Sequence, residues 1–197
     1  MPELLPPDGT PWPEATAAVR LFLRSTFEEL AGWCARDALD HRPEPGSWTG
    51  REVLEHVHLT DHYLFVLADK LADKSAARAA RGMSWPARPA TFSLFASAAT
   101  VSWPHPQHMT PGGGVEGARL AADLRSDLAR AEELLARFPD GQATLHTIRF
   151  SVVDARLDLV QLLAFAGLHG WRHLRQLERL AAAARGAGGG QPGDLEG

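Results

Sequence analysis

The sequence predicts an all-α protein, a four-helix bundle with a long connection between its second and third helices. Four segments of about twenty residues or more repeat apolar side chains at three- and four-residue steps, the period of a helix that buries one face. No segment of comparable length alternates apolar and polar residues as a half-buried strand does, although residues 144–153 could be extended. Proline-rich and glycine-rich ends predict an extended arm over 1–13, a single folded domain over 14–185 and a flexible tail over 186–197.

The first two helices have start and stop signals in the sequence. The apolar pattern predicts the first helix over residues 14–38, and Pro43 prevents its continuation. The second helix is expected over residues 49–74. Thr49 is its predicted N-cap, and Glu52 follows three residues later, which is the spacing of a capping box.

The last two helices are expected over residues 115–138 and 155–184, and a Pro-Asp-Gly sequence ends the first of them. The connection over residues 82–114 is rich in proline and ends in three glycines. So long a connection has two interpretations, a crossover that runs the length of the bundle or a lid over a site, and both can hold at once. It is also rich in aromatic and sulfur-containing side chains: Trp85, Trp103, His105, His108 and Met109.

Composition excludes several classes of protein. The formal net charge of −4 provides no general electrostatic footprint for nucleic acid or an anionic membrane. No apolar run is long enough to span a bilayer, and the N-terminus lacks the features of a secretory signal. Cys34 is the only cysteine, and we interpret it as a small buried residue in a protein of the reducing cytoplasm.

Helical geometry sorts the histidines of the second helix. His56 falls on the edge of its apolar arc and is expected to point toward the core. His58 and His62 have the i, i+4 spacing of a metal-binding pair. Their side of the helix is polar, however, so we expect these two histidines to face solvent, together with Arg51, Glu55 and Asp69.

The fourth helix places two histidines inside its apolar sector, one turn apart. Buried neutral imidazoles need hydrogen-bond partners, and the i, i+4 spacing lets His169 and His173 bind one ion on the same helix face. His56 is the available third ligand, and three protein ligands with an open position are typical of a catalytic metal site. The opposite, solvent-facing arc carries Gln161, Arg172, Arg175 and Arg179.

Two stretches carry a resemblance to a known family. RPEPGSWTGREVLEHVHLTDH has a proline- and tryptophan-bearing entry followed by a helix with V-L-x-H, and LLAFAGLHGWRHLRQLERL has the pattern H-x-x-x-H-x-x-Q. With these stretches the chain resembles the DinB/YfiT-like superfamily of four-helix-bundle metalloenzymes, which includes thiol S-transferases and mycothiol-dependent maleylpyruvate isomerase. The family's metal triad, carried onto this chain, falls on His56, His169 and His173.

The resemblance implies a divalent metal cofactor, for which three imidazoles suit zinc, nickel or iron, and it allows a low-molecular-weight thiol as a second cofactor. An ion in such a site would lower the pKa of water or of a thiol at its open position. Thr60, one turn beyond His56, either contacts the group at that position or packs as an ordinary helix threonine. Gln176 either caps a metal ligand or faces solvent.

Two functional hypotheses follow. The first is a cytoplasmic metal-dependent enzyme, thiol S-transferase-like or a hydrolase, that acts on a small molecule and has no nucleic-acid or membrane partner. The second is a non-catalytic metal-binding or metal-free stress-related bundle that acts through dimerisation or partner binding. A homodimer is expected in either case, because two-fold symmetric assemblies are the commonest oligomers.

Overall fold

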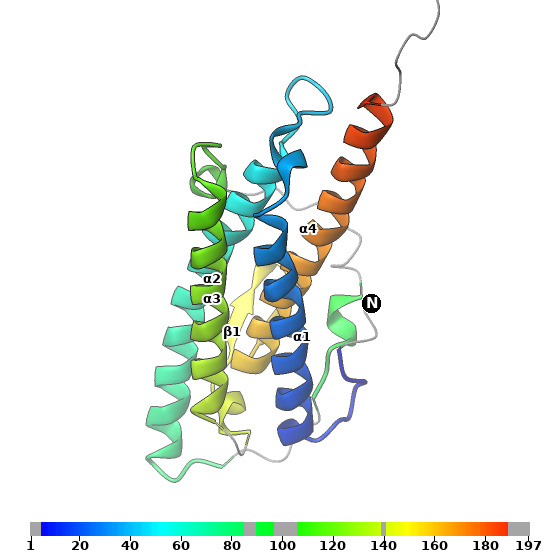
Figure 1. Cartoon of the computed structure of the whole chain (residues 1–197). Coiled ribbons are helices and arrows are strands. Elements are labelled where there is room, and N and C mark those ends of the chain that lie inside the picture. Colours follow the sequence, from blue (N-terminus) through cyan, green and yellow to red (C-terminus); the bar gives the residue numbers. More distant parts are fainter. Residues whose placement is uncertain (1–4, 85–89, 97–105, 139–140, 189–197) are drawn as a thin grey trace, which may run out of the picture.

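The structure is a computed structural model that describes residues 5–84, 90–96, 106–138 and 141–188. Four long helices pack side by side in it, and the C-terminal part of the fourth projects beyond the others (Figure 1). The predicted all-α four-helix bundle is therefore confirmed. The helices are α1 (Trp12–Trp33), α2 (Gly50–Ala79), α3 (Gly117–Ala136) and α4 (Leu159–Gly188).

Short elements connect the four helices. Five single-turn 3-10 helices lie in the described connections, and one two-stranded antiparallel hairpin precedes α4. They are η1 (Asp37–Asp40), η2 (Ser93–Phe95), η3 (Gln107–Met109), η4 (Gln142–Leu145), β1 (Ile148–Phe150), η5 (Ser151–Val153) and β2 (Ala155–Leu157).

The long connection is a crossover, because α2 and α3 run in the same direction. Near the start of both helices, the Arg51 guanidinium lies 3.4 Å from the Val115 carbonyl oxygen. Near their far ends, Arg137 pairs with Asp73 at 3.0 Å. The chain must therefore return over the length of the bundle between Ala79 and Gly117. The residues Trp85, Trp103 and His105 of this connection lie outside the described part.

The helix boundaries differ from the predicted ones where tertiary contacts intervene. The first helix ends at Trp33 rather than near residue 38, and the chain then turns so that Leu39 packs against the start of α2. A Cβ atom on Gly50 would lie 2.9 Å from the Leu39 side chain, which shows how closely the two segments pack. The predicted capping box is present: the Thr49 amide donates to Glu52 Oε2 at 2.7 Å, and the Glu52 amide donates to Thr49 Oγ1 at 3.2 Å.

The fourth helix begins four residues later than predicted, because residues 155–157 pair with β1. Asp158 then starts the helix with a reciprocal cap: its Oδ1 accepts from the Gln161 amide at 2.9 Å, and Gln161 Oε1 accepts from the Asp158 amide at 3.1 Å. Gln161, which the helical pattern assigned to solvent, is buried. Its side-chain amide donates to the Thr91 carbonyl of the crossover at 2.8 Å, so the crossover covers this part of α4. At its other end α4 continues to Gly188, into the predicted tail.

The N-terminal segment also holds the crossover. Asp8 Oδ1 accepts hydrogen bonds from the amides of Phe92 and Ser93 at 2.6 and 3.0 Å, and the Gly9 amide donates to the Ala90 carbonyl at 2.8 Å. The Ser93 hydroxyl donates to Asp8 Oδ2, and this bond, together with those from the two amides to Oδ1, keeps the pKa of Asp8 below its usual value. The segment lies beside η2 in Figure 1. The described part of the predicted arm is thus packed against the domain.

Close packing of α1 on α4 fixes the register of the site-bearing helix. A Cβ atom on Gly167 would lie 2.8 Å from the Phe22 ring, so only glycine allows this approach. Phe22, Phe27 and Leu30 of α1 are fully buried in the same core. Burying a side chain of this size stabilises the fold by roughly 1.5–3 kcal/mol. None of the described helices is both long and apolar enough to cross a membrane.

Candidate metal centre

Three histidines from two helices converge in the bundle. His56 lies in the second turn of α2, and His169 and His173 lie one turn apart on the antiparallel α4. One ligand nitrogen from each ring lies within 4.8 Å of the others. All three side chains are buried, with 4–8% of their surface exposed. Among the described residues they form the only group of three or more potential metal ligands of this kind.

Hydrogen bonding determines which nitrogen of His56 faces the cluster. His56 Nδ1 lies 2.8 Å from the Met109 carbonyl oxygen. A carbonyl oxygen only accepts, so Nδ1 carries the proton and Nε2 keeps its lone pair. The Trp48 ring covers the imidazole, with 4.8 Å between the ring centroids. A neutral His56 is therefore oriented with one nitrogen available to an ion.

The α4 pair is arranged in the same way. His173 Nδ1 donates to Gln176 Oε1 at 2.9 Å, which leaves Nε2 of His173 with a lone pair. This atom lies 3.2 Å from His169 Nε2. Two imidazole nitrogens that share one tetrahedral ion lie about 3.3 Å apart, because each Zn–N bond is about 2.0–2.1 Å. The spacing within the α4 pair thus matches that expected on a single ion.

Electrostatics keeps the α4 pair neutral. Burial and, to a smaller extent, the neighbouring His56 lower the pKa of His173 to about 4. Burial and the neighbouring His173 also hold the pKa of His169 well below its usual value. Metal ligation requires neutral imidazole. Near pH 7 both histidines are already neutral, so neither has to release a proton before it binds an ion. The donor set, its burial and its protonation fit a divalent ion.

The two further predicted residues have different environments. Gln176 does not simply face solvent, since its side chain accepts the hydrogen bond from His173 and fixes the orientation of that ring. Thr60 is buried on α2, and its hydroxyl has no hydrogen-bond partner within the described ranges. It lies one turn from His56 on the same helix. An unsatisfied buried hydroxyl in this position is available to a bound molecule.

The prediction that His58 and His62 both face solvent is wrong for one of them. His58 is partly buried and its Nδ1 lies 2.8 Å from Asp127 Oδ2 on α3. His62 is exposed and its ring contacts Tyr63, with 5.6 Å between centroids. Neither belongs to the candidate metal centre. The α2 face that carries His58 packs against α3, which the helical pattern of α2 alone does not reveal.

The remaining histidines lie elsewhere. His108 is exposed, and its ring contacts that of Tyr63 in a tilted arrangement, with ring centroids 4.1 Å apart. His41 and His146 are partly buried in connections. Burial lowers the pKa of His146, and Arg78 and Lys74 add to this effect.

Three contributors to the site were missed from the sequence. The Met109 carbonyl orients His56, the Trp48 ring covers it, and Glu55 is buried with 8% of its surface exposed rather than facing solvent. A backbone carbonyl leaves no mark in the residue pattern. Glu55 was wrongly expected to face solvent, because the segment that covers its side of α2 is a loop rather than another helix.

Cys34 lies at the end of α1 and is buried, as predicted. Burial raises the pKa of its thiol to about 11, and its Sγ donates to the Leu30 carbonyl at 3.5 Å. The thiol is therefore protonated near pH 7 and unreactive. Cys34 is the only cysteine of the chain, so the protein supplies no thiolate of its own.

Comparison with known proteins agrees with this architecture. A family model described as the DinB superfamily matches residues 15–177, which include α2, α3, most of α1, the first two thirds of α4 and the three histidines. The search of curated proteins and the search of solved structures each returned no match.

Proposed function

The chain belongs to the DinB superfamily, and we propose that it is a metal-dependent enzyme that acts on a small molecule through His56, His169 and His173. The observation that carries the proposal is the convergence of three buried imidazoles, two of which have Nδ1 bonded to an acceptor outside the cluster. Such bonds leave the other nitrogen of each of these two rings for an ion, and the ligand atoms of the three histidines lie within 4.8 Å of one another. A group of histidines that serves only packing does not require this arrangement.

Each part of the site has a distinct role in this proposal. A divalent ion held there would supply Lewis acidity and lower the pKa of a bound nucleophile. His56, His169 and His173 would hold it, with their orientation set by Met109 and Gln176. The buried Thr60 hydroxyl would donate to or accept from the small molecule. The Trp48 ring restricts the access of water to His56.

The nucleophile comes from outside the chain. Cys34 is buried and protonated, so a thiol that takes part in the reaction must be a low-molecular-weight co-substrate. We propose thiol S-transfer, in which a thiolate displaces a leaving group from an electrophilic carbon, or hydrolysis, in which water attacks instead. Both reactions need a deprotonated nucleophile near neutral pH. A metal ion held by three histidines would lower the pKa of a bound thiol or water and so supply one.

The proposal is tested on protein purified without a histidine tag. The purified and reconstituted protein is first assayed for stoichiometric zinc, nickel and iron. The loaded protein is then assayed with a chromogenic electrophile in the presence of several low-molecular-weight thiols, and with an activated ester in their absence. We expect metal-dependent turnover in one of the two assays, and loss of that turnover in His169→Ala/His173→Ala.

The outcomes separate the two classes of function. Absence of stoichiometric metal after reconstitution, with no change in stability in the double alanine variant, would contradict the enzyme proposal. A metal-free or non-catalytic bundle that acts through dimerisation or partner binding would then be the better account. Stoichiometric metal without turnover on either substrate would reject both proposed reactions and retain the metal site.

A further inference from the structure

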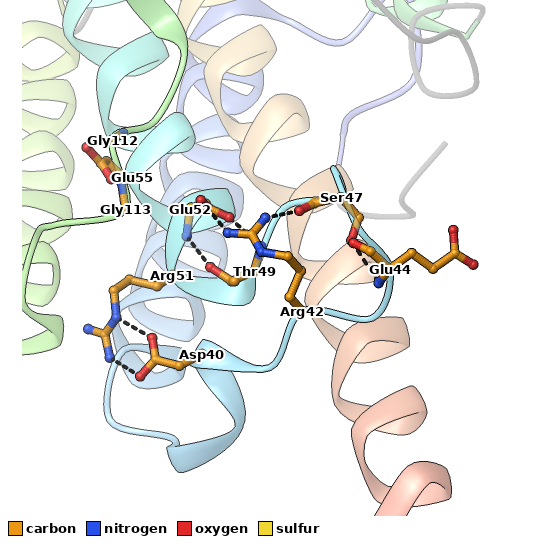
Figure 2. A network of polar contacts seen from close by, with 10 residues as sticks. All are labelled: Asp40, Arg42, Glu44, Ser47, Thr49, Arg51, Glu52, Glu55, Gly112 and Gly113. Atoms are coloured by element: carbon orange, nitrogen blue, oxygen red, sulfur yellow. Dashed lines mark hydrogen bonds and ion pairs between the residues drawn. The ribbon is translucent and has the colours of Figure 1, made fainter.

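Glu55 is a buried carboxylate next to a candidate metal ligand. It directly precedes His56 on α2, and 8% of its surface is exposed. Its two oxygens accept hydrogen bonds from consecutive backbone amides: Oε1 from Gly112 at 3.0 Å and Oε2 from Gly113 at 2.7 Å (Figure 2). Burial of a carboxylate is unfavourable unless both oxygens are bonded, and here both are.

The loop that Glu55 holds is the one that orients His56. The Met109 carbonyl accepts a hydrogen bond from His56 Nδ1 at 2.8 Å, and Met109 lies three residues before Gly112. Glu55 and His56 are neighbours on α2, so they bind the two ends of a single short segment over residues 109–113. Because the segment is so short, the position of the Met109 carbonyl depends on where its other end is held.

The sequence of the loop suits this attachment. Gly113 has φ +74°, in the left-handed region that favours glycine. A Cβ atom there would also lie 3.2 Å from Glu52 Oε1. Gly114 differs in both respects, since its φ is not in the positive range and a Cβ atom would meet nothing within 4 Å. One glycine is therefore needed for the loop to reach Glu55, and its neighbour serves as a matched control.

Glu52, one turn before Glu55 on α2, holds a different loop, the one that precedes α2 and carries Trp48. Its Oε1 accepts from Arg42 at 2.9 Å and its Oε2 from the Thr49 amide at 2.7 Å, next to Trp48 (Figure 2). The Met109 carbonyl and the Trp48 ring, which contact His56 from outside the histidine cluster, thus both belong to loops that carboxylates of the first two turns of α2 hold. The Glu55 attachment is distinct, because it controls a hydrogen bond to the imidazole itself.

We propose that Glu55 is a positioning residue of the metal centre: by holding Gly112 and Gly113 it places the Met109 carbonyl, keeps the proton of His56 on Nδ1 and leaves Nε2 to the ion. This inference rests on the proposed metal-dependent function. A ring whose outer nitrogen loses its partner can rotate or take the other tautomer, which places a proton on the nitrogen that must bind.

The test uses the full chain with Glu55→Gln, Gly113→Ala, the double variant and the control Gly114→Ala. The first readout is the tautomer of His56 in the metal-free protein, from ¹⁵N chemical shifts of the imidazoles. We expect Nδ1–H in the parent protein and in Gly114→Ala. In the other three variants we expect a mixture with Nε2–H.

The second readout is the affinity for Zn²⁺, measured by competition with a chromogenic chelator. We expect Glu55→Gln to weaken binding by about 10- to 100-fold, the range for loss of a group that orients a metal ligand. Gly113→Ala acts on the same attachment, so the double variant should be little weaker than the weaker single variant. Gly114→Ala should bind as the parent does.

The outcomes distinguish this inference from the proposed function. If the parent binds no Zn²⁺ the proposed function fails, and the tautomer of His56 still tests the attachment. If Glu55→Gln is folded by circular dichroism and leaves both the tautomer and the affinity unchanged, the positioning role is wrong. If Glu55→Gln does not fold, Gly113→Ala alone decides, since it breaks the attachment without a change in α2.

Discussion

Two pairs of histidines in this protein share the same i, i+4 spacing on a helix and have different environments. His169 and His173 on α4 are both buried, and their Nε2 atoms lie 3.2 Å apart. His58 and His62 on α2 diverge, because His58 bonds Asp127 at 2.8 Å and His62 is exposed beside Tyr63. The spacing brings two rings to one side of a helix, but what lies opposite decides whether they can share an ion.

The difference lies in the partner that the neighbouring helix supplies. Opposite the α4 pair, α2 presents another imidazole with its outer nitrogen already bonded to the Met109 carbonyl. Opposite His58, α3 presents a carboxylate, whose hydrogen bond raises the pKa of the imidazole. The first arrangement supplies lone pairs, and the second favours a proton on the ring.

Removal of one imidazole from the α4 pair should have the largest effect. We expect His173→Ala to weaken the binding of Zn²⁺ by more than about 100-fold, because loss of a ligand exceeds the 10- to 100-fold effect of losing an orienting group. Isothermal titration with and without a competing chelator measures this change. An affinity equal to that of the parent would exclude His173 as a ligand.

Asp61 of α2 contrasts with the histidines. It is also a buried ionisable group, but among the described residues it lacks hydrogen-bond partners such as those of His56, His58 and His173. It is fully buried, and neither carboxylate oxygen has a hydrogen-bond partner in the described part of the chain. Burial raises the pKa of Asp61 well above its usual value, and the neighbouring Asp127 adds to the effect. Asp61 therefore binds a proton more tightly in the folded chain than in the unfolded one.

Asp61→Asn should remove a pH-dependent loss of stability. An acid whose pKa is raised by folding lowers the free energy of unfolding as the pH rises above its unfolded pKa, about 3.9. We expect the variant to be more stable than the parent by about 1–3 kcal/mol at pH 7 and to approach it near pH 4. Urea denaturation at both pH values measures this. An equal gain at both would show that ionisation of Asp61 is not the cause.

His58→Ala tests whether this histidine has a structural role. The substitution leaves Asp127 without its imidazole partner in a site where burial already raises the pKa of the carboxyl. We expect a loss of about 1–3 kcal/mol in the free energy of unfolding, the range for a buried group deprived of its partner. The same variant should retain Zn²⁺ affinity, and a large fall in affinity would place His58 at the metal site.

His62→Ala should have the smallest effect. The side chain is exposed, and its ring contacts that of Tyr63 with 5.6 Å between centroids. We expect a change within about 0.5 kcal/mol in the free energy of unfolding, as for surface positions in general. Thermal denaturation of the metal-free protein is sufficient to measure it, and a loss above 1 kcal/mol would reveal a contact that the exposure of the ring does not suggest.

Apart from His58, which α3 covers, the sequence predicts helix–helix contacts better than loop–helix contacts. Apolar periodicity places His56, His169 and His173 toward the core, because each faces another long helix. Gln161 and Glu55 were assigned to solvent, yet both are buried under segments of the crossover. A loop has no periodicity, so the polar residues that it covers look the same in sequence as those that water covers.

The ends of the helices show the same limit. The capping box of Thr49 and Glu52 was read correctly, because it depends only on residues three apart. The start of α4 was placed too early, since residues 155–157 pair with a strand whose partner is not visible in local propensity. The Met109 carbonyl could not be predicted at all, because any residue type supplies one.

The most direct test of the account is the metal content of three tag-free proteins after reconstitution with Zn²⁺ and gel filtration. They are the parent, His169→Ala/His173→Ala and His58→Ala/His62→Ala. The account predicts about one ion per chain in the parent and in the α2 variant, and close to none in the α4 variant. A parent without metal, or an α2 variant that loses the ion while the α4 variant keeps it, would contradict it.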